Sequence, residues 1–460
     1  MNRREMLRMM GAGFGAVGMA GVLGAASVDP VRDPLAPKPP HFPAKAKRVI
    51  YLFLNGGPSQ VDTFDPKPML TKYNGQPMPA GNLKTERKTG NLLKSPFEFK
   101  KYGQSGIEVS EIFPKIGALA DDLCVIRSMY TDRPNHEPSL FLLNCGEKLP
   151  GRPAMGSWLT YGLGTENQNL PGFVVLCPGL PVLGHALWSS TFLPAVHQGT
   201  YLPLGEKDPK KLIEHIRNPR LSDDKQRKEL DLLSKLNRIH LEHEGGDPEL
   251  EASIQSAEIA FRMQKEAPDA FDITKEPEHI RARYGDGNFA RGCLIARRLC
   301  ERGVRMVQVY YGNFQPWDNH DDIMLHRDLA NLSDGPIAAL LQDLKASGLL
   351  DETIVLIGGE FGRTPAVEVG GLVKVQNGRD HNNHGFTYLV AGGGFKRGYV
   401  HGATDDFGFK SVDKRVHIHD LHATVLNQMG LDHKRLTYRY SGRDYRLTDV
   451  HGELVQDIIA

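Results

Sequence analysis

Carboxylate and imidazole side chains, which bind metal ions and exchange protons, gather in a few polar segments of this 460-residue chain. These segments and their candidate residues are 55–65 with Asp62, 317–322 with Asp318 and His320, 358–364 with Glu360, and 379–384 with His381 and His384. Such side chains form a site for Zn, Mn or a similar ion when separate segments bring them to one point. An Asp or Asn beside each of His320, His381 and His384 indicates metal ligands or residues that orient them.

Short apolar runs before three of these segments predict the strands that position them. Residues 49–54, 304–311 and 353–357 are apolar runs, and each is followed by one of the polar segments. Further runs at 386–390 and 172–177 predict two more strands. Ligands of a parallel sheet collect beyond the carboxyl ends of its strands. The 379–384 segment differs, because it precedes a strand.

Helical patterns alternate with these strands. Residues 288–302 and 333–347 have apolar side chains at helical spacing, and Ser333 or Asp334 is a candidate N-cap of the second helix. The alternation predicts an α/β fold with a mainly parallel sheet covered by helices on both faces. Residues 222–266 are charged and helical in period, so we predict a two-helix insertion there.

Composition excludes several classes of protein. Hydrophobic residues make up 40% and charged residues 24% of the chain, as in soluble globular proteins. The net charge of +1 gives no sign of a nucleic-acid partner. Five cysteines without regular spacing are a poor disulfide framework, and we interpret Cys293 and Cys300, which share one face of a helical pattern, as buried apolar residues.

The N-terminus predicts export. Asn2-Arg3-Arg4-Glu5-Met6-Leu7-Arg8 resembles the twin-arginine signal, and an uncharged stretch at 9–26 follows it. The alternative is a membrane anchor, although the glycine-rich stretch is only weakly apolar, so no stable span is expected. We predict a signal peptide at 1–27, a proline-rich linker at 28–45, a core at 46–435 and a C-terminal extension at 436–460. Localisation would be periplasmic or secreted, with the twin-arginine export machinery as a partner.

Three segments together resemble a known family. Residues 340–362 resemble the helix, strand and metal loop of sulfatases and alkaline phosphatases, with Glu360 at the aspartate position. With the export signal, residues 56–68 (Gly-Gly-Pro-Ser-Gln-Val-Asp-Thr-Phe-Asp-Pro-Lys-Pro) and 359–365 (Gly-Glu-Phe-Gly-Arg-Thr-Pro) resemble the exported family named domain of unknown function 1501.

This resemblance implies an alkaline-phosphatase-like three-layer α/β/α sandwich with one or two divalent cations, Zn, Mn or Ca. The ligands that it implies are Asp62, Asp318, His320, Glu360, His381 and His384. Asn55 lies nearer than Asp62 to the usual strand-end aspartate but would be a weaker, neutral ligand. Arg363 and Arg379 are candidates to bind the anionic ester group of a substrate, or are surface arginines.

The nucleophile position departs from the family pattern. In residues 135–146, His136 lies where a sulfatase has its modified cysteine, serine or threonine, and Leu140 replaces an arginine. At a predicted helix start, His136 is a candidate nucleophile, general acid or base, or another ligand. Ser139 is the other candidate nucleophile, and we interpret it as an ordinary early helix residue.

The leading hypothesis is an exported metal-dependent hydrolase or transferase that acts on a phosphate or sulfate ester of a small molecule or polysaccharide. The alternative is a non-catalytic exported binding protein on a degenerate sulfatase-like scaffold.

Overall fold

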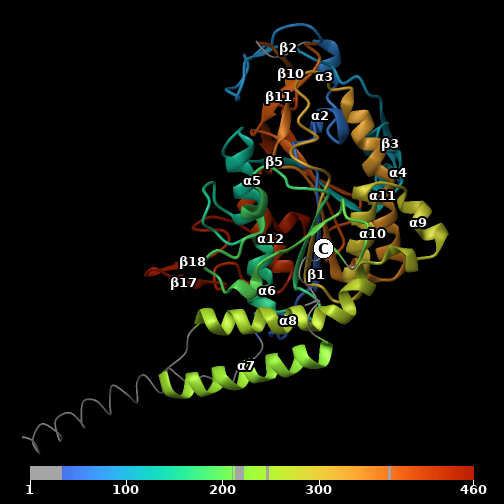
Figure 1. The fold of residues 1–460 in the computed structure, drawn as a ribbon. Coiled ribbons are helices and arrows are strands. Elements are labelled where there is room, and N and C mark those ends of the chain that lie inside the picture. Colours follow the sequence, from blue (N-terminus) through green and yellow to red (C-terminus); the bar gives the residue numbers. More distant parts are fainter. Residues whose placement is uncertain (1–33, 210, 213–221, 245–247, 371–374) are drawn as a thin grey trace, which may run out of the picture.

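The computed structural model describes residues 34–209, 211–212, 222–244, 248–370 and 375–460. The predicted signal peptide and the first part of the linker lie outside these residues. The described part of the chain forms a nine-stranded sheet with helices on both faces (Figure 1). Its strands, in spatial order, are β13 (Tyr399–His401), β5 (Leu123–Tyr130), β12 (Phe386–Ala391), β9 (Thr353–Gly358), β1 (Arg48–Phe53), β8 (Met306–Tyr310), β6 (Phe173–Cys177) and β7 (Thr200–Pro203), with β16 (Val416–His417) beside the end of β5.

The sheet is mainly parallel, as predicted. Only β12 runs against its neighbours, β5 and β9, among the described strands of this sheet. The five apolar runs of the sequence correspond to β1, β8, β9, β12 and β6. The carboxyl ends of β1, β8 and β9 therefore meet at one edge, because these neighbouring strands are paired in parallel.

Alternate side chains of the central strands pack against two different helical layers. Ile50 and Leu52 of β1 lie in one apolar cluster, whereas Val49 and Tyr51 lie in the other. The first cluster includes the helices α10 (Asn288–Glu301) and α11 (Leu325–Ala346), and the second includes α5 (His136–Cys145), α6 (Met155–Leu163) and α12 (Ile418–Gln428). The result is the predicted three-layer α/β/α sandwich.

One predicted helix boundary is wrong. Helix α11 begins at Leu325 rather than near residue 333, so Pro336 lies inside the helix. Asp334 was a candidate cap of this helix, but its carboxylate instead accepts the backbone N–H groups of Lys115 and Ile116, at 2.9 and 2.8 Å. Asp334 therefore stabilises the start of helix α4 (Pro114–Gly117), which is far away in the sequence and has no acidic residue of its own in its first turn.

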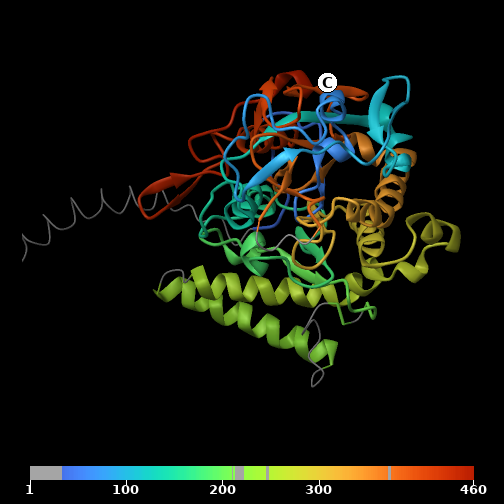
Figure 2. The same cartoon turned by 90° about the horizontal axis from the view of Figure 1, so that it is seen from above.

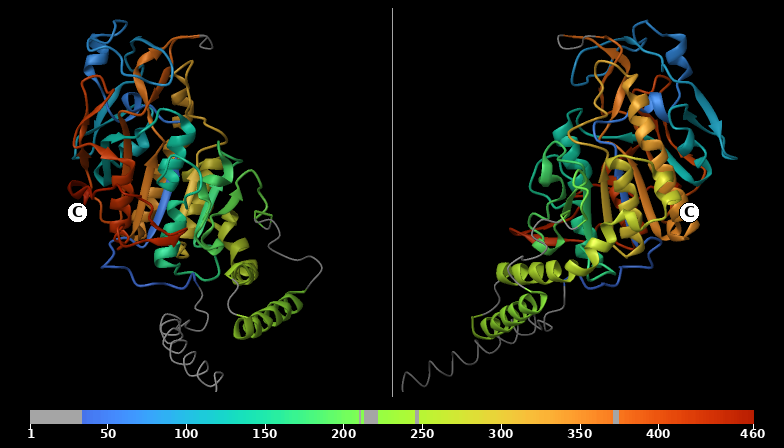
Figure 3. Two further views of the ribbon diagram at one scale, coloured as in Figure 1. Left: turned by 90° about the vertical axis from the view of Figure 1, so that its left-hand side faces the viewer. Right: turned by 45° about the vertical axis from the view of Figure 1, so that its right-hand side comes forward.

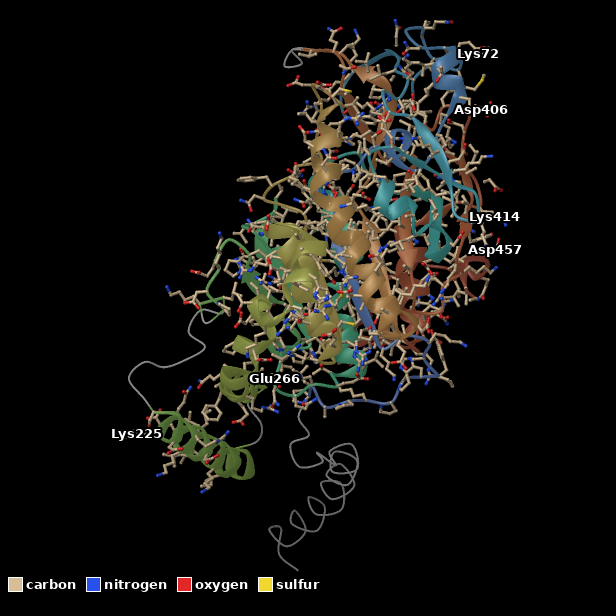
Figure 4. The ribbon with its side chains drawn as sticks, turned by 90° about the vertical axis from the view of Figure 1, so that its right-hand side faces the viewer. Lys72, Lys225, Glu266, Asp406, Lys414 and Asp457 are labelled. Carbon is tan, nitrogen blue, oxygen red and sulfur yellow. The ribbon has the colours of Figure 1, made fainter. Side chains whose placement is uncertain are left out.

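The charged region near 222–266 forms two long helices, α7 (Asp223–Glu244) and α8 (Pro248–Phe271). They lie side by side at the end of the molecule opposite α2 (Gln60–Thr63) and α3 (Pro68–Lys72) (Figures 1 and 3). Figure 2 shows the pair projecting beyond the sandwich. Figure 4 marks the two ends, with Lys225 on α7 at one and Lys72 on α3 at the other.

Smaller elements surround the sandwich. A three-stranded sheet beyond the carboxyl ends of the central strands contains β11 (Arg379–Asn382), β10 (Gly362–Glu368) and β2 (Thr89–Leu92). The other described helix and hairpins are α9 (Glu278–Tyr284), β3 (Phe99–Tyr102) with β4 (Ile107–Ser110), β14 (Ala403–Thr404) with β15 (Ser411–Asp413), and β17 (Tyr438–Tyr440) with β18 (Arg443–Tyr445).

The structure also tests what the sequence indicates about the cysteines and about membrane-spanning helices. All five cysteines are free of disulfide bonds, as interpreted from their spacing, and all five are buried. Among the described helices, none combines the length and the apolar character that crossing a bilayer requires.

Candidate metal centre

Three imidazoles surround one carboxylate beyond the carboxyl ends of β1, β8 and β9. The Nε2 atoms of His136, His320 and His381 lie 3.3, 2.8 and 3.0 Å from Oδ1 of Asp318. The rings also contact one another, because the centroid of His381 lies 4.3 Å from that of His136 and 4.7 Å from that of His320. Four residues from three separate segments thus direct nitrogen and oxygen atoms at one point.

Each of these imidazoles has a carboxylate on its other nitrogen. The Nδ1 atom of His136 lies 2.6 Å from Oε1 of Glu360, and that of His381 lies 2.6 Å from Oε2 of Glu86. The Nδ1 atom of His320 is bonded to Glu368. Carboxylates placed in this way hold metal-binding imidazoles in one tautomer and orientation, with Nε2 directed at the ion.

Tight backbone packing brings the segment after β1 to the segment after β8. A Cβ atom on Gly56 would lie 2.6 Å from the backbone nitrogen of Asp318, so only glycine fits here. The N–H group of Gly56 donates to both carboxylate oxygens of Glu360, at 3.0 and 3.2 Å. The glycines of the sequence motif therefore bring the Asp318 segment and Glu360 together.

The pairing of β10 with β11 brings two further site residues together. Arg363 lies opposite His381 in this antiparallel register. The Arg363 guanidinium donates to Asp318 Oδ1 at 2.6 Å and to the carbonyl of Gly57 at 2.9 Å. It thus holds Asp318 in place from the side of the small sheet.

The site is largely buried and strongly acidic. Burial alone would lower the pKa of His136, but hydrogen bonds to Asp318 and Glu360 outweigh burial and raise it to about 9. Burial raises the pKa of Asp318, but Arg363 and the three imidazoles hold it well below its usual range. The surroundings therefore favour the ionised carboxylate of Asp318 and the protonated imidazole of His136.

The residues present fit a divalent metal ion. The Nε2 atoms of His136 and His320 are buried and lack a hydrogen-bond partner of proper geometry. His136, Asp318 and His381 form one candidate ligand group, and His320, Glu368 and Asp380 form a second one beside it. Imidazole-rich sets suit Zn or Mn, whereas Ca prefers oxygen ligands.

The structure brings together Asp318, His320, His381, Glu360 and His136 from the sequence-based candidates, but with different placements. Glu360 is fully buried behind His136 rather than beside the other donors. His136 begins α5 as expected, yet its ring belongs to the cluster. Ser139 is occupied by a 2.7 Å bond to the carbonyl of Arg133, in keeping with an ordinary helix residue.

Four other candidates have structural partners. The Asp62 carboxylate receives two bonds from Arg379, at 2.7 and 3.1 Å, and both side chains are fully buried. His384 Nε2 is 3.0 Å from the carbonyl of Lys84, and His384 belongs to neither candidate ligand group. Arg363 is fully buried and bonded to Asp318 and backbone carbonyls, so neither arginine presents its guanidinium to a substrate in this arrangement.

Sequence reasoning missed three carboxylates. Glu368 is the last residue of β10 and lies between Val367 and Val369, a pattern that signals a partner for a buried charge. Asp380 directly precedes His381 and accepts its backbone N–H. Glu86 lies in a charged, irregular segment and carries no local signal.

These features define a parallel α/β/α protein with a buried histidine and carboxylate cluster at the carboxyl edge of its sheet. The chain belongs to the family described as protein of unknown function (DUF1501), which it matches over residues 46–459. The match confirms the resemblance and extends past the predicted core boundary at 435. The search of curated proteins found no match to the chain.

Solved structures similar to this fold include sulfatases and phosphatases. Ps i-CgsB in complex with k-i-k-neocarrahexaose is 10% identical, with a TM-score of 0.38 and coverage of 84% of this chain and 72% of that one. The PsFucS1 sulfatase from Pseudoalteromonas sp. is 12% identical, with a TM-score of 0.35 and coverage of 84% and 68%. A TAB5 alkaline phosphatase variant with Mg bound is 10% identical, with a TM-score of 0.36 and coverage of 84% and 99%. At these scores, no residue role passes from those proteins to this chain.

Proposed function

We propose that this protein is an exported hydrolase that uses a divalent metal ion to cleave phosphate or sulfate esters. One observation carries the metal-dependent part of the proposal. Three imidazoles direct Nε2 at Asp318, and each has a carboxylate on Nδ1. Carboxylates on Nδ1 that direct Nε2 at one point are the arrangement that metal-binding imidazoles require.

The ligands would be His136, His320, His381 and Asp318. Asp318 keeps its second oxygen for the ion, because its contacts with the three imidazoles and with Arg363 all involve Oδ1. A bound Zn or Mn ion would polarise the ester oxygen and lower the pKa of a bound water. The protein supplies the geometry, since Glu360 and Glu368 fix two of the imidazoles.

The ester class is supported by the sequence resemblance to sulfatases and alkaline phosphatases. Among the described residues, the hydrogen bonds of His136, His320, His381 and Asp318 involve no Ser, Thr or Cys side chain. We therefore infer direct attack by water rather than a covalent intermediate on a hydroxyl or thiol. Export is supported by the twin-arginine pattern at Asn2–Arg8.

The binding-protein alternative has one observation in its favour. Only 2% of His381 and 7% of His136 are exposed, so the cluster is closed to a large ligand in this conformation. A metal in such a site would serve stability rather than catalysis. Turnover by the metal-loaded protein separates the two functions.

The test is metal analysis of protein purified from the export compartment, combined with assays on phosphate and sulfate esters. Wild-type protein should carry close to one ion or more per chain and hydrolyse at least one ester. His320→Ala should lose both metal and activity. Metal-loaded protein without turnover on the panel would support the binding-protein alternative, and metal-free wild type that cannot be reconstituted would contradict the metal-dependent hydrolase.

A further inference from the structure

The proposed hydrolase needs a cationic side chain that binds the anionic ester group. The two arginines expected in that role, Arg363 and Arg379, are bonded to other groups of the protein. Arg379 is bonded to Asp62 and to the carbonyls of Thr364 and Leu93. Arg363 is bonded to Asp318 and to the carbonyls of the Gly56–Gly57 segment. Releasing either guanidinium would leave buried acceptors unpaired, so the anion-binding group must come from another segment.

Residues 81–88, which we call the basic strap, contact the metal-binding cluster through Glu86 and its neighbouring carboxylates through Arg87. This segment contains Lys84, Arg87 and Lys88 against one acid, Glu86, and forms no helix or strand before β2 begins at Thr89. Most of its residues are exposed, and Leu83 is its only large apolar residue. A segment with so little buried apolar surface opens at low cost in free energy.

The strap is attached to the residues that orient the cluster. The backbone N–H of Arg87 donates to Asp380 at 2.7 Å, and its Nη1 atom donates to Oε1 of Glu368 at 3.0 Å. Glu368 in turn holds His320. The side chain of Arg87 is 40% exposed, so its guanidinium is bonded to Glu368 and is also accessible to solvent.

Movement of the strap would not disorder the imidazole that it contacts. The Nδ1 atom of His381 lies 2.6 Å from Glu86 but also 2.7 Å from the carbonyl of Pro134. The carbonyl keeps the same tautomer when Glu86 withdraws. The orientation of His381, which is only 2% exposed, therefore does not depend on the strap alone.

We propose that the basic strap is the substrate-facing gate of this site and that Arg87 is the residue that binds the anionic group of the ester. This inference rests on the proposed function. On substrate entry, the Arg87 guanidinium exchanges its bond to Glu368 for bonds to two oxygens of the phosphate or sulfate group, as the planar fork of arginine allows. Glu368 keeps its bond to His320.

The experiment titrates Zn-loaded wild-type protein and variants with inorganic phosphate and sulfate by calorimetry, and measures Zn affinity separately. Arg87→Ala should weaken anion binding by about 10- to 100-fold, the effect of losing charge-assisted hydrogen bonds. Zn affinity should change less than about threefold, because Arg87 is not a ligand. Arg87→Lys should restore part of the anion affinity, since it keeps the charge and loses the fork.

Two control variants, one of a lysine and one of an arginine, test whether the loss of anion binding is specific to Arg87. Lys72→Ala removes an exposed cation at the same end of the molecule (Figure 4) and should leave anion binding unchanged. Arg133→Ala removes an exposed arginine three residues before His136 and should have a small effect.

The outcomes separate this inference from the proposed function. Wild-type protein that binds no Zn contradicts the proposed function itself. Three outcomes would overturn the role of Arg87. They are Zn-loaded wild type that binds neither phosphate nor sulfate, an Arg87→Ala variant that binds them normally, and an Arg87→Ala variant that also loses Zn. A loss caused by Arg133→Ala instead would overturn it too.

Discussion

Replacing Glu360 by Gln tests whether this residue orients His136 or binds the metal itself. Glu360 is fully buried and accepts the N–H of Gly56 as well as the Nδ1–H of His136. A glutamine of the same shape keeps one acceptor oxygen and replaces the other by an NH₂ group. With Oε1 retained for both donors, the NH₂ group faces the Gly56 N–H in place of Oε2, and the charge that makes the imidazole a stronger ligand is lost.

The expected loss is that of an orienting carboxylate. Replacing such a group costs about 10- to 100-fold in metal affinity, or about 1.4–2.8 kcal/mol. In the metal-free protein, the unpaired donor should cost about 1–3 kcal/mol of unfolding free energy. Removal of a direct ligand should cost far more, so Asp318→Asn is the reference for that behaviour.

The assay is competition for Zn and for Mn against a chromogenic chelator at fixed pH, with urea unfolding of each metal-free variant. Glu278→Gln, an exposed glutamate on α9, is the matched control and should behave as wild type. A Glu360→Gln affinity within about threefold of wild type would refute the orienting role. A loss as large as that of Asp318→Asn would identify Glu360 as a ligand.

Three further predictions concern the scaffold. Asp62→Asn breaks the buried ion pair with Arg379 and should lower the unfolding free energy, measured in urea, by about 3–5 kcal/mol. The folded variant should still bind Zn. Loss of Zn binding with normal stability would instead place Asp62 in the metal site. Gly56→Ala should abolish tight Zn binding, because its Cβ atom would lie 2.6 Å from the backbone nitrogen of Asp318. The control Gly106→Ala, at another position of positive φ but with open space around it, should only lower the unfolding free energy by about 1 kcal/mol. Equal Zn affinities of the two variants would contradict this prediction. Burial lowers the pKa of His422 to about 3, so the unfolded chain binds the extra proton below about pH 6.5, and this histidine costs stability as pH falls. His422→Gln should therefore reduce the pH dependence of the unfolding free energy, measured in urea, by up to about 1.4 kcal/mol per pH unit between pH 6.5 and 5, and an unchanged slope would refute it.

The sequence predicted the sheet well because its strands carry a local signal. Continuous apolar runs such as 353–357 need no knowledge of distant residues, and each became a buried strand. The start of α11 was missed because Asp334 has the local pattern of a helix cap, yet its partners are 219 and 218 residues away in the chain. Tertiary contacts there override the local preference.

The site was predicted in composition but not in arrangement. Asp318, His320 and His381 were expected to converge, and their Nε2 and Oδ1 atoms do so. Their outer carboxylates were missed or misplaced, because a residue such as Glu86 acquires its position only from the folded strap. Asp62 had the residue type and place of a ligand, and only the packing against Arg379 shows its structural partner.

The most direct test of the central claim is anomalous diffraction at the metal edge from crystals of protein purified from the export compartment. We expect an anomalous peak at bonding distance from the Nε2 atoms of His136, His320 and His381 and from an oxygen of Asp318. Crystals of Zn- or Mn-soaked protein with no peak there, and with Arg363 and the imidazoles still closed on Asp318, would contradict it.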